Sequence, residues 1–357
     1  MVKSCEVEFA GNPSKTVFSG QKVNGRVSIV VDEPKAVKKI KLQIHGYAHV
    51  TFKQFDSSYF DTVDYIDTTS NLIEPKPGED QLTLGAGTHT FDFQFEIPPN
   101  CPSSYESYDG QVRYLMKVTI VRPIIFNQIR NIGFTVINSL NLNNCTLDMS
   151  LPLLCNTEKS MWFGLSKRNI VKVSGKVTKS GFVPGEKIPI EITINNKSTM
   201  DITEIVADLV LKSKCTTRKS FRTQYRHKTV ATTKSTELKG VKGNIFVQMN
   251  LEIPPIPSST NGNCEILDLS YFVDAVIKFS GPHRSSVVNF PLLIGTIPVG
   301  AQKAGHPDSV NFADLGIEPP TYEQATFVDT AKLSELGENS IGNDNFTPLY
   351  PKYSLKS

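Results

Sequence analysis

The 357-residue sequence lacks any run of about 18 apolar residues, so no transmembrane helix is expected. Its first residues, Met-Val-Lys-Ser-Cys-Glu-Val-Glu-Phe, contain no apolar core and carry two acidic side chains, so we expect no secretory signal. The six cysteines include no Cys-x-x-Cys pair and have no histidine partners at zinc-site spacing. We therefore interpret them as reduced thiols of a cytosolic protein.

Motifs of enzyme chemistry are also missing. The sequence contains no Gly-x-Ser-x-Gly turn, no Gly-Lys-Ser/Thr phosphate loop and no Gly-x-Gly-x-x-Gly fingerprint. His45 and His49 stand four apart, which would suit a metal pair on a helix. The surrounding alternation indicates a strand, however, and no third ligand is evident. We expect no enzymatic activity, no cofactor and no metal site.

The composition supports folded domains. Hydrophobic residues are 39% of the chain and charged residues 20%, which excludes global disorder. The net charge of +3 is uneven, because residues 301–357 carry 4 basic and 8 acidic residues while the rest carries 34 and 27. A mildly basic body suits acidic protein tails or anionic lipid better than nucleic acid, and we expect no nucleic-acid partner.

Apolar and polar residues alternate along much of the chain. Residues 39–45 place Ile40, Leu42 and Ile44 on one face, and residues 91–97 repeat the pattern. One dry face and one wet face are typical of antiparallel sheets packed as sandwiches. Gly and Pro interrupt the runs, and convincing helical periodicity is hard to find. The sequence therefore predicts an all-β protein.

The two halves of the chain share short motifs in the same order, which predicts two copies of one β-sandwich. The matched positions are Lys22 and Lys187, Ile40 and Ile205, Phe95 and Leu251, and Tyr114 and Tyr271. Their offset falls from 165 to 156 after the second pair. We place the extra residues of the first half in the polar stretch 53–80, interpreted as a long loop. Chance similarity between two β-domains is the alternative.

Four segments resemble those of arrestin domain-containing proteins, the α-arrestin family. They are Asn12–Gly25, Phe95–Pro99, Asp109–Tyr114 and Pro291–Pro298. The resemblance covers nearly the whole chain and implies two tandem arrestin-type, immunoglobulin-like antiparallel β-sandwich domains plus a disordered C-terminal tail. The implied units are an N-domain at 1–150, a linker at 151–165, a C-domain at 166–300 and the tail at 301–357.

The resemblance also implies a function. Members of the family are non-enzymatic trafficking adaptors that link membrane receptors or transporters to WW-domain ubiquitin ligases of the HECT class. We therefore expect promotion of cargo ubiquitination, endocytosis and endosomal sorting by a cytoplasmic protein recruited to the plasma membrane and endosomes. An arrestin-fold sorting-coat or signalling scaffold without ligase dependence is the alternative. An extracellular adhesion module is a third class, which would carry disulfides and glycans.

The tail contains a Pro-Pro-x-Tyr motif at Pro319, Pro320 and Tyr322. Two adjacent prolines fix φ at about −65° and favour the polyproline II conformation, which WW domains bind in an aromatic groove. These three residues are therefore candidate WW-binding residues, and a chance proline pair is the alternative. Pro348 and Tyr350 form a second, weaker candidate, because the first proline is missing and only half of the rigid turn remains. Another tyrosine-based signal is the alternative for this segment.

Residues 212–242 hold ten basic residues against one acidic residue. The simpler interpretation is a solvated face of a long strand pair, because exposed lysine and arginine are common. The alternative is an anion-binding surface for phosphorylated or acidic cargo tails, or for anionic lipid head groups. Its candidate residues are Lys212, Lys214, Arg218, Lys219, Arg222, Arg226 and Lys228.

Overall fold

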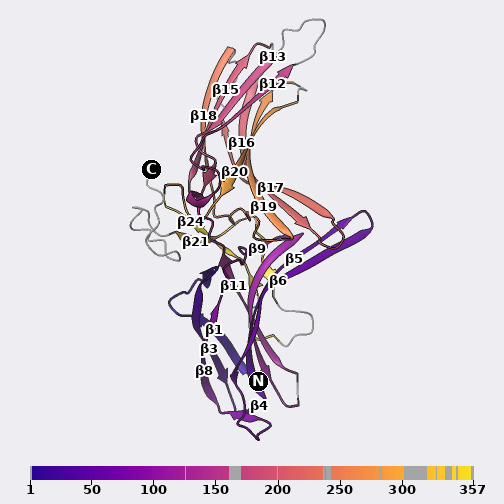
Figure 1. Ribbon diagram of the computed structural model, residues 1–357, viewed down its shortest axis with the longest axis vertical. Coiled ribbons are helices and arrows are strands. Elements are labelled where there is room, and N and C mark those ends of the chain that lie inside the picture. The colour runs from indigo at the N-terminus through magenta and orange to yellow at the C-terminus, as the bar shows by residue number, and fades with distance from the viewer. Residues whose placement is uncertain are drawn as a thin grey trace.

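The computed structural model shows an elongated molecule in which two β-sandwich domains lie end to end (Figure 1). The residues that it describes are 2–124, 126–160, 170–198, 200–235, 238, 243–281, 284–300, 320–326, 328–333, 340–342 and 345–354. In this part of the chain, no helix has the length and apolar character needed to cross a bilayer.

The first domain packs a three-stranded sheet against a larger one. The smaller sheet has the order β1 (Val2–Phe9), β3 (Lys22–Val31), β8 (Gly87–Glu96). The larger has the order β2 (Thr16–Phe18), β11 (Gln128–Ile137), β10 (Gly110–Val121), β5 (Lys39–Gln54), β6 (Ser57–Ile73), with β9 (Tyr105–Glu106) paired to β10. A ribbon of β4 (Lys35–Val37) and β7 (Leu82–Leu84) lies at the end far from the second domain (Figure 1).

The second domain repeats this arrangement after a 3-10 turn, η1 (Leu142–Asn144). One sheet has the order β12 (Leu153–Ser160), β13 (Ile170–Val177), β15 (Lys187–Asn196), β18 (Gly243–Glu252). The other has the order β14 (Gly181–Phe182), β20 (Ser286–Ile294), β19 (Leu267–Phe279), β16 (Ile202–Thr216), β17 (Thr223–Ser235).

The alternation of apolar and polar residues determines which side chains form the core. Ile40, Leu42 and Ile44 are 0%, 2% and 3% exposed, as their alternation predicts. Buried and half-buried residues also alternate along all of β10. Burying an aliphatic side chain contributes about 1.5–3 kcal/mol, so these faces hold the sheets together. The predicted all-β sandwich class is confirmed.

The internal duplication is also confirmed, down to single hydrogen bonds. The Tyr114 hydroxyl donates to the Pro102 carbonyl oxygen at 2.7 Å, and the Tyr271 hydroxyl donates to that of Pro257 at the same distance. The short strands β2 and β14 are equivalent as well, because each pairs in parallel with the last strand of its domain. Two domains that shared motifs by chance would not repeat these contacts.

The polar stretch 53–80 differs from its interpretation as a long loop. Residues Ser57–Ile73 form β6, which is antiparallel to β5 at the edge of the sheet. Most side chains of β6 are exposed, and Ile66 is its one buried residue. From Tyr59 to Tyr65, half-buried and exposed residues alternate, and Tyr59, Val63 and Tyr65 pack against the core. The half-buried Asp61 on the same face and the polar residues after Ile66 conceal this pattern in the sequence.

Part of the stretch expected as a linker, 151–165, is a strand, and its residues 161–165 lie outside the described residues. Residues Leu153–Ser160 form β12, which pairs with β13 along its full length at the edge of the second domain. Its side chains are exposed or half-buried from Leu153 to Lys159. The polar sequence Asn-Thr-Glu-Lys within it resembles a linker, although its backbone completes a sheet.

The expectation of a disordered tail at 301–357 covers residues 301–319, 327, 334–339, 343–344 and 355–357, which lie outside the described residues. The described residues of the tail are strands and short connections. They form β21 (Thr321–Gln324), β22 (Ala331–Lys332), β23 (Asn345–Phe346) and β24 (Leu349–Lys352). The strands pair as β21 with β24 and β22 with β23. Isolated two-stranded ribbons are marginally stable, so contacts with the domains hold these strands in place.

Candidate functional site: the tail ribbon and the domain junction

The two-stranded ribbon of β21 and β24 lies where the two domains meet (Figure 1). In its antiparallel register, Tyr322 stands opposite Pro351 and Glu323 opposite Tyr350. The structure therefore brings the two proline-tyrosine motifs together as partners in one ribbon. Sequence reasoning missed this pairing, because 28 residues separate the two tyrosines and neither strand shows alternation.

Tyr350 anchors the ribbon of β21 and β24 to the first domain. Its side chain is 2% exposed, and its hydroxyl donates to the Ser104 carbonyl oxygen at 3.2 Å. The preceding Leu349 amide donates to Thr135 Oγ1 at 3.1 Å. Burial raises the pKa of Tyr350 well above its usual value. Pro348 is buried too, so neither residue of the second candidate motif is accessible in this conformation.

Tyr353 anchors the same segment to the second domain. Its amide donates to the Pro184 carbonyl oxygen at 3.0 Å, and its hydroxyl donates to the Thr296 carbonyl oxygen. Tyr353 is 3% exposed, and burial raises its pKa. Gly185 allows the close approach, because a Cβ there would lie 2.1 Å from the Tyr353 carbonyl oxygen. Residues Leu349–Tyr353 thus connect both domains, and we call this segment the clasp.

The first candidate motif is held less firmly. Pro319 lies outside the described residues. Pro320 is buried, Thr321 is exposed, and Tyr322 is half-buried with a pKa that burial raises. Thr321 Oγ1 donates to the Lys352 carbonyl oxygen at 3.4 Å. Thr321 and Tyr322 of the motif therefore lie in an extended strand, whereas a WW groove binds polyproline II.

The basic candidates of 212–228 divide into two groups. Arg218 and Arg226 connect the domains: Arg218 Nη2 donates to Asp61 Oδ1 at 2.8 Å, and the Arg226 guanidinium donates to the buried carboxylate of Asp109. The Arg218 guanidinium lowers the pKa of Asp61 well below its usual value. These two arginines are thus already engaged by carboxylates.

The other basic candidates lie along β16, β17 and the turn between them. Lys212 Nζ lies 4.8 Å from the centre of the Tyr225 ring, and the Arg222 guanidinium lies 5.8 Å from that of Tyr59. Lys214 is half-buried, whereas Lys219 and Lys228 are exposed. Positive charge therefore remains concentrated at the β16–β17 turn.

The histidine pair lies on β5 and faces β6. His45 Nε2 lies 2.9 Å from Asp64 Oδ1, and His49 Nδ1 lies 2.8 Å from Thr62 Oγ1. Within the residues that the structure describes, no three histidine, cysteine, aspartate or glutamate side chains are grouped as metal ligands.

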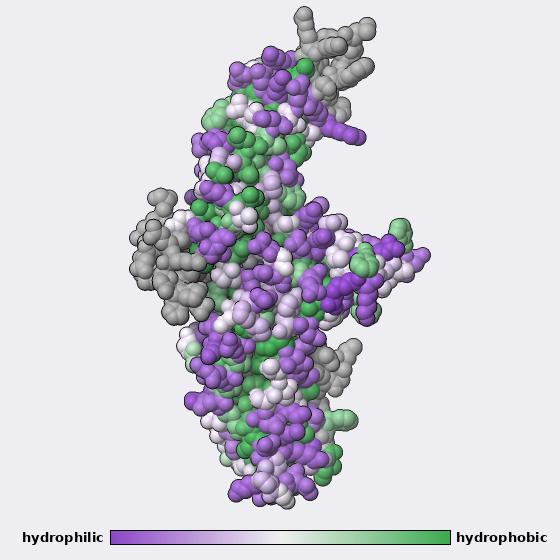
Figure 2. Space-filling view, in the orientation of Figure 1, coloured by the Kyte–Doolittle hydropathy of each residue, from purple (hydrophilic) through white to green (hydrophobic). Residues whose placement is uncertain are grey.

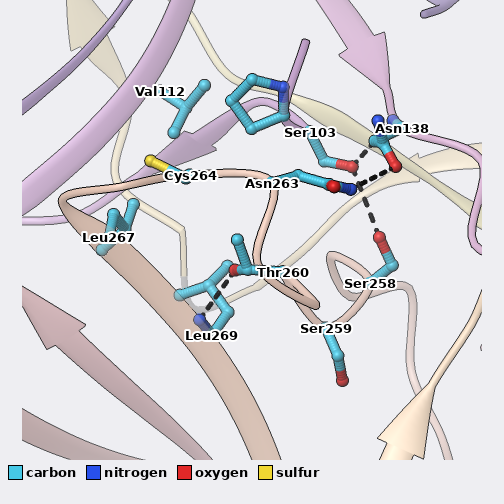
Figure 3. Close-up of a pocket in the computed structure, with 11 residues that line it drawn as sticks. Ser103, Val112, Asn138, Ser258, Ser259, Thr260, Asn263, Cys264, Leu267 and Leu269 are labelled. Carbon is cyan, nitrogen blue, oxygen red and sulfur yellow. Dashed lines mark hydrogen bonds between the residues drawn. The ribbon is translucent and has the colours of Figure 1, made fainter. Parts of the chain in front are cut away.

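A small polar pocket marks the seam between the domains (Figure 3). Asn263 Nδ2 donates to Asn138 Oδ1 at 2.7 Å, and the hydroxyls of Ser103 and Ser258 lie 3.3 Å apart. The cavity volume is about 10 Å³, which is room for about one water molecule. The seam therefore joins the domains and does not hold a small-molecule ligand.

Two duplicated sandwiches joined at such a seam define a two-domain arrestin fold, and sequence comparison agrees. The family model for the arrestin (or S-antigen) N-terminal domain matches residues 5–143, and the model for the arrestin C-terminal domain matches residues 167–299. The chain belongs to the arrestin family.

Its relatives identify the branch of that family. The chain is 26% identical to arrestin domain-containing protein 17 of Caenorhabditis elegans, over 93% of this chain and 82% of that protein. It is 27% identical to human arrestin domain-containing protein 4, over 83% and 72%. It is 25% identical to mouse arrestin domain-containing protein 1, over 78% of this chain and 61% of that protein. The chain is thus an α-arrestin-type protein with an adaptor role, and the resemblance expected from its sequence is confirmed.

Proposed function

We propose that this protein links membrane receptors or transporters to a WW-domain ubiquitin ligase of the HECT class, which binds Pro319, Pro320 and Tyr322. The observation that carries the proposal is the position of the motif. Thr321 and Tyr322 of the motif lie on a two-stranded ribbon outside both sandwich cores, and Thr321 and the following Glu323 are exposed. A ribbon of this kind separates from its partner without unfolding either domain.

The adaptor acts by raising effective concentration. Cargo held by the domains and a ligase held by the tail belong to one complex, so cargo lysines meet the ligase far more often than by free diffusion. Ubiquitination then promotes endocytosis and endosomal sorting. The protein works from the cytoplasm, from which cargo recruits it to the plasma membrane and endosomes.

Ligase binding requires β21 to leave β24, because the paired strand is extended and Pro320 is buried. The affinity of the full chain is therefore the affinity of the free motif multiplied by the fraction of molecules in which β21 has separated from β24. Pro348 and Tyr350 become a second, weaker site only after the clasp leaves Ser104 and Thr135.

The experiment is a pull-down from cells that compares wild type with a Pro320→Ala/Tyr322→Ala variant. We expect the double variant to lose the ligase and cargo ubiquitination while it keeps cargo. Thr321→Ala is the matched control, because the third position of the motif is exposed and variable. Equal ligase recovery with the double variant would contradict the proposal.

The burial of Pro320 and Tyr350 favours a second candidate function, a sorting-coat or signalling scaffold that needs no ligase. Under this alternative, the tail serves only to hold the two domains together. Tyr322→Ala separates the two functions, since a scaffold would keep normal cargo trafficking with this substitution and a ligase adaptor would not.

A further inference from the structure

One edge of the second domain lacks the features that normally keep sheet edges from pairing. β18 is an edge strand of its sheet, and among the described residues it pairs only with β15. Figure 1 shows β18 along the outer margin of this domain, and Figure 2 shows hydrophobic side chains among hydrophilic ones on the same margin. An edge strand presents free N–H and C=O groups, which form a template for another strand.

The other long edge strands are protected against such pairing. Charged side chains stand on β1, β8 and β12, and β6 and β17 combine charges with a register shift against their neighbours. β18 has neither form of protection. Its register with β15 is continuous, and its residues from Gly243 to Leu251 include no charged residue and no proline. Because natural proteins protect exposed edges by such means, an unprotected edge indicates that another strand pairs with it.

The outward face of β18 is complementary to itself. Asn244, Phe246 and Gln248 are exposed there, and Phe246 is 63% exposed. An antiparallel copy of β18 centred on Phe246 would place the two Phe246 rings side by side. The same register would place Asn244 of each chain opposite Gln248 of the other. Cross-strand aromatic pairs and amide pairs both stabilise a sheet.

We propose that two copies of this protein pair through β18, antiparallel and about a twofold axis at Phe246. On the inner face, Ile245 of each chain then stands opposite Val247 of the other, so the two sheets and their cores continue across the contact. A second copy fits this edge better than an unrelated protein does. The uncharged strand offers a partner no charge to recognise, whereas residues 243–249 supply both sides of a symmetric contact.

The shape of the molecule agrees with this pairing. The antiparallel orientation directs the first domains of the two copies toward opposite ends, so these elongated chains do not collide (Figure 1). One strand pair is a smaller contact than a standard interface, so the dimer dissociates on dilution. The dimer carries two copies of the tail motif. Ligase binding by one chain does not depend on the dimer, so failure of this proposal leaves the proposed function intact.

The first experiment is sedimentation velocity of the full chain over a range of concentrations, in which we expect a dimer that grows with concentration. Phe246→Lys removes the aromatic pair and places like charges opposite each other, so it should raise the dissociation constant by about tenfold or more. Leu154→Lys is the matched control and should leave the dimer unchanged. It replaces a 72% exposed residue of β12, at the other edge of the same sheet.

Two charge designs test the register. Asn244→Lys/Gln248→Lys places like charges opposite each other and should abolish the dimer, whereas Asn244→Glu/Gln248→Lys places opposite charges together and should keep it. Thermal unfolding of each variant checks that the domains stay folded, and exposed residues of an edge strand should have little effect on it. The reverse order of the two designs would overturn the proposal.

Disulfide trapping with oxidised glutathione gives a direct readout. In Phe246→Cys the two introduced residues have Cα atoms about 5 Å apart, within reach of a disulfide, so a covalent dimer should form. In Asn244→Cys the two Cα atoms are about 13 Å apart, so little should form. The wild type accounts for the native cysteines. A wild-type chain that stays monomeric at every concentration, or a dimer that Phe246→Lys leaves unchanged, would overturn the proposal.

Discussion

At the scale of single residues, two buried tyrosines of the tail attach it to the two domains. Tyr350 contacts the first domain through Ser104, and Tyr353 contacts the second through Pro184 and Thr296. A sequence motif in a polar tail gives no sign of such burial. The sequence identified Tyr322 and Tyr350 as residues of interest, but only their partners reveal that one is half-buried and the other fully buried.

Replacement of Tyr350 tests whether it anchors the tail. Tyr350→Ala removes a buried aromatic ring and should release β24 with its partner β21, so amide hydrogen exchange should rise in both strands and stay unchanged in β10 and β19. Tyr350→Phe removes only a hydrogen bond worth about 1 kcal/mol and should have a small effect. Unchanged exchange in the tail of the Ala variant would show that Tyr350 is not the anchor.

The pair of Asp61 and Arg218 predicts a pH dependence. Because the folded pKa of Asp61 is lowered, its contribution to stability is present above the unfolded value of about 3.9 and is lost as the pH falls toward the folded value. The difference in unfolding free energy between wild type and Asp61→Asn should therefore be largest near neutral pH and shrink below about pH 4. Chemical denaturation across this range measures it.

Asp56→Asn is the control for that series, since Asp56 is an exposed carboxylate of the same hairpin. A difference between wild type and Asp61→Asn that is constant over the whole pH range would contradict the assigned ion pair.

At the scale of elements, the sequence predicted strands with a fully buried apolar face and missed strands whose inward face is only half-buried. Ile40, Leu42 and Ile44 of β5 alternate with polar residues, whereas the half-buried faces of β6 and β12 include polar side chains such as Asp61, Thr157 and Lys159. The physical reason is that an edge strand covers less of the core, so polar side chains are tolerated on its inward face and obscure the alternation in the sequence. The duplicated domains were predictable because Tyr114 and Tyr271 occupy equivalent core positions.

A glycine of β11 tests how the ribbon of β22 and β23 is held. A Cβ at Gly133 would lie 2.3 Å from Cγ of Phe346, so Gly133→Ala should displace this ring and release the ribbon. We expect limited proteolysis to cleave the tail of this variant several times faster. Gly85→Ala is the control, because a Cβ there meets nothing within 4 Å. Equal cleavage of both variants would contradict the packing of Phe346 on β11.

At the scale of the whole molecule, three features of the junction act together. Arg218 and Arg226 connect the hairpin of β16 and β17 to the first domain, the polar seam of Figure 3 lies between the domains, and the clasp contacts both. Under the proposed function, the first motif binds a ligase only when the tail leaves this junction. The sequence could predict the family and the motif, but not that Pro320 is buried and Tyr322 half-buried beside the domain junction.

The most direct measurement is a calorimetric titration of a ligase WW domain into three samples: a free peptide containing Pro319–Tyr322, the full chain, and the full chain with Tyr350→Ala. We predict that the peptide binds most tightly, that the wild-type chain binds more weakly, and that Tyr350→Ala recovers much of the difference. A free peptide that fails to bind any WW domain of a HECT ligase would contradict the account.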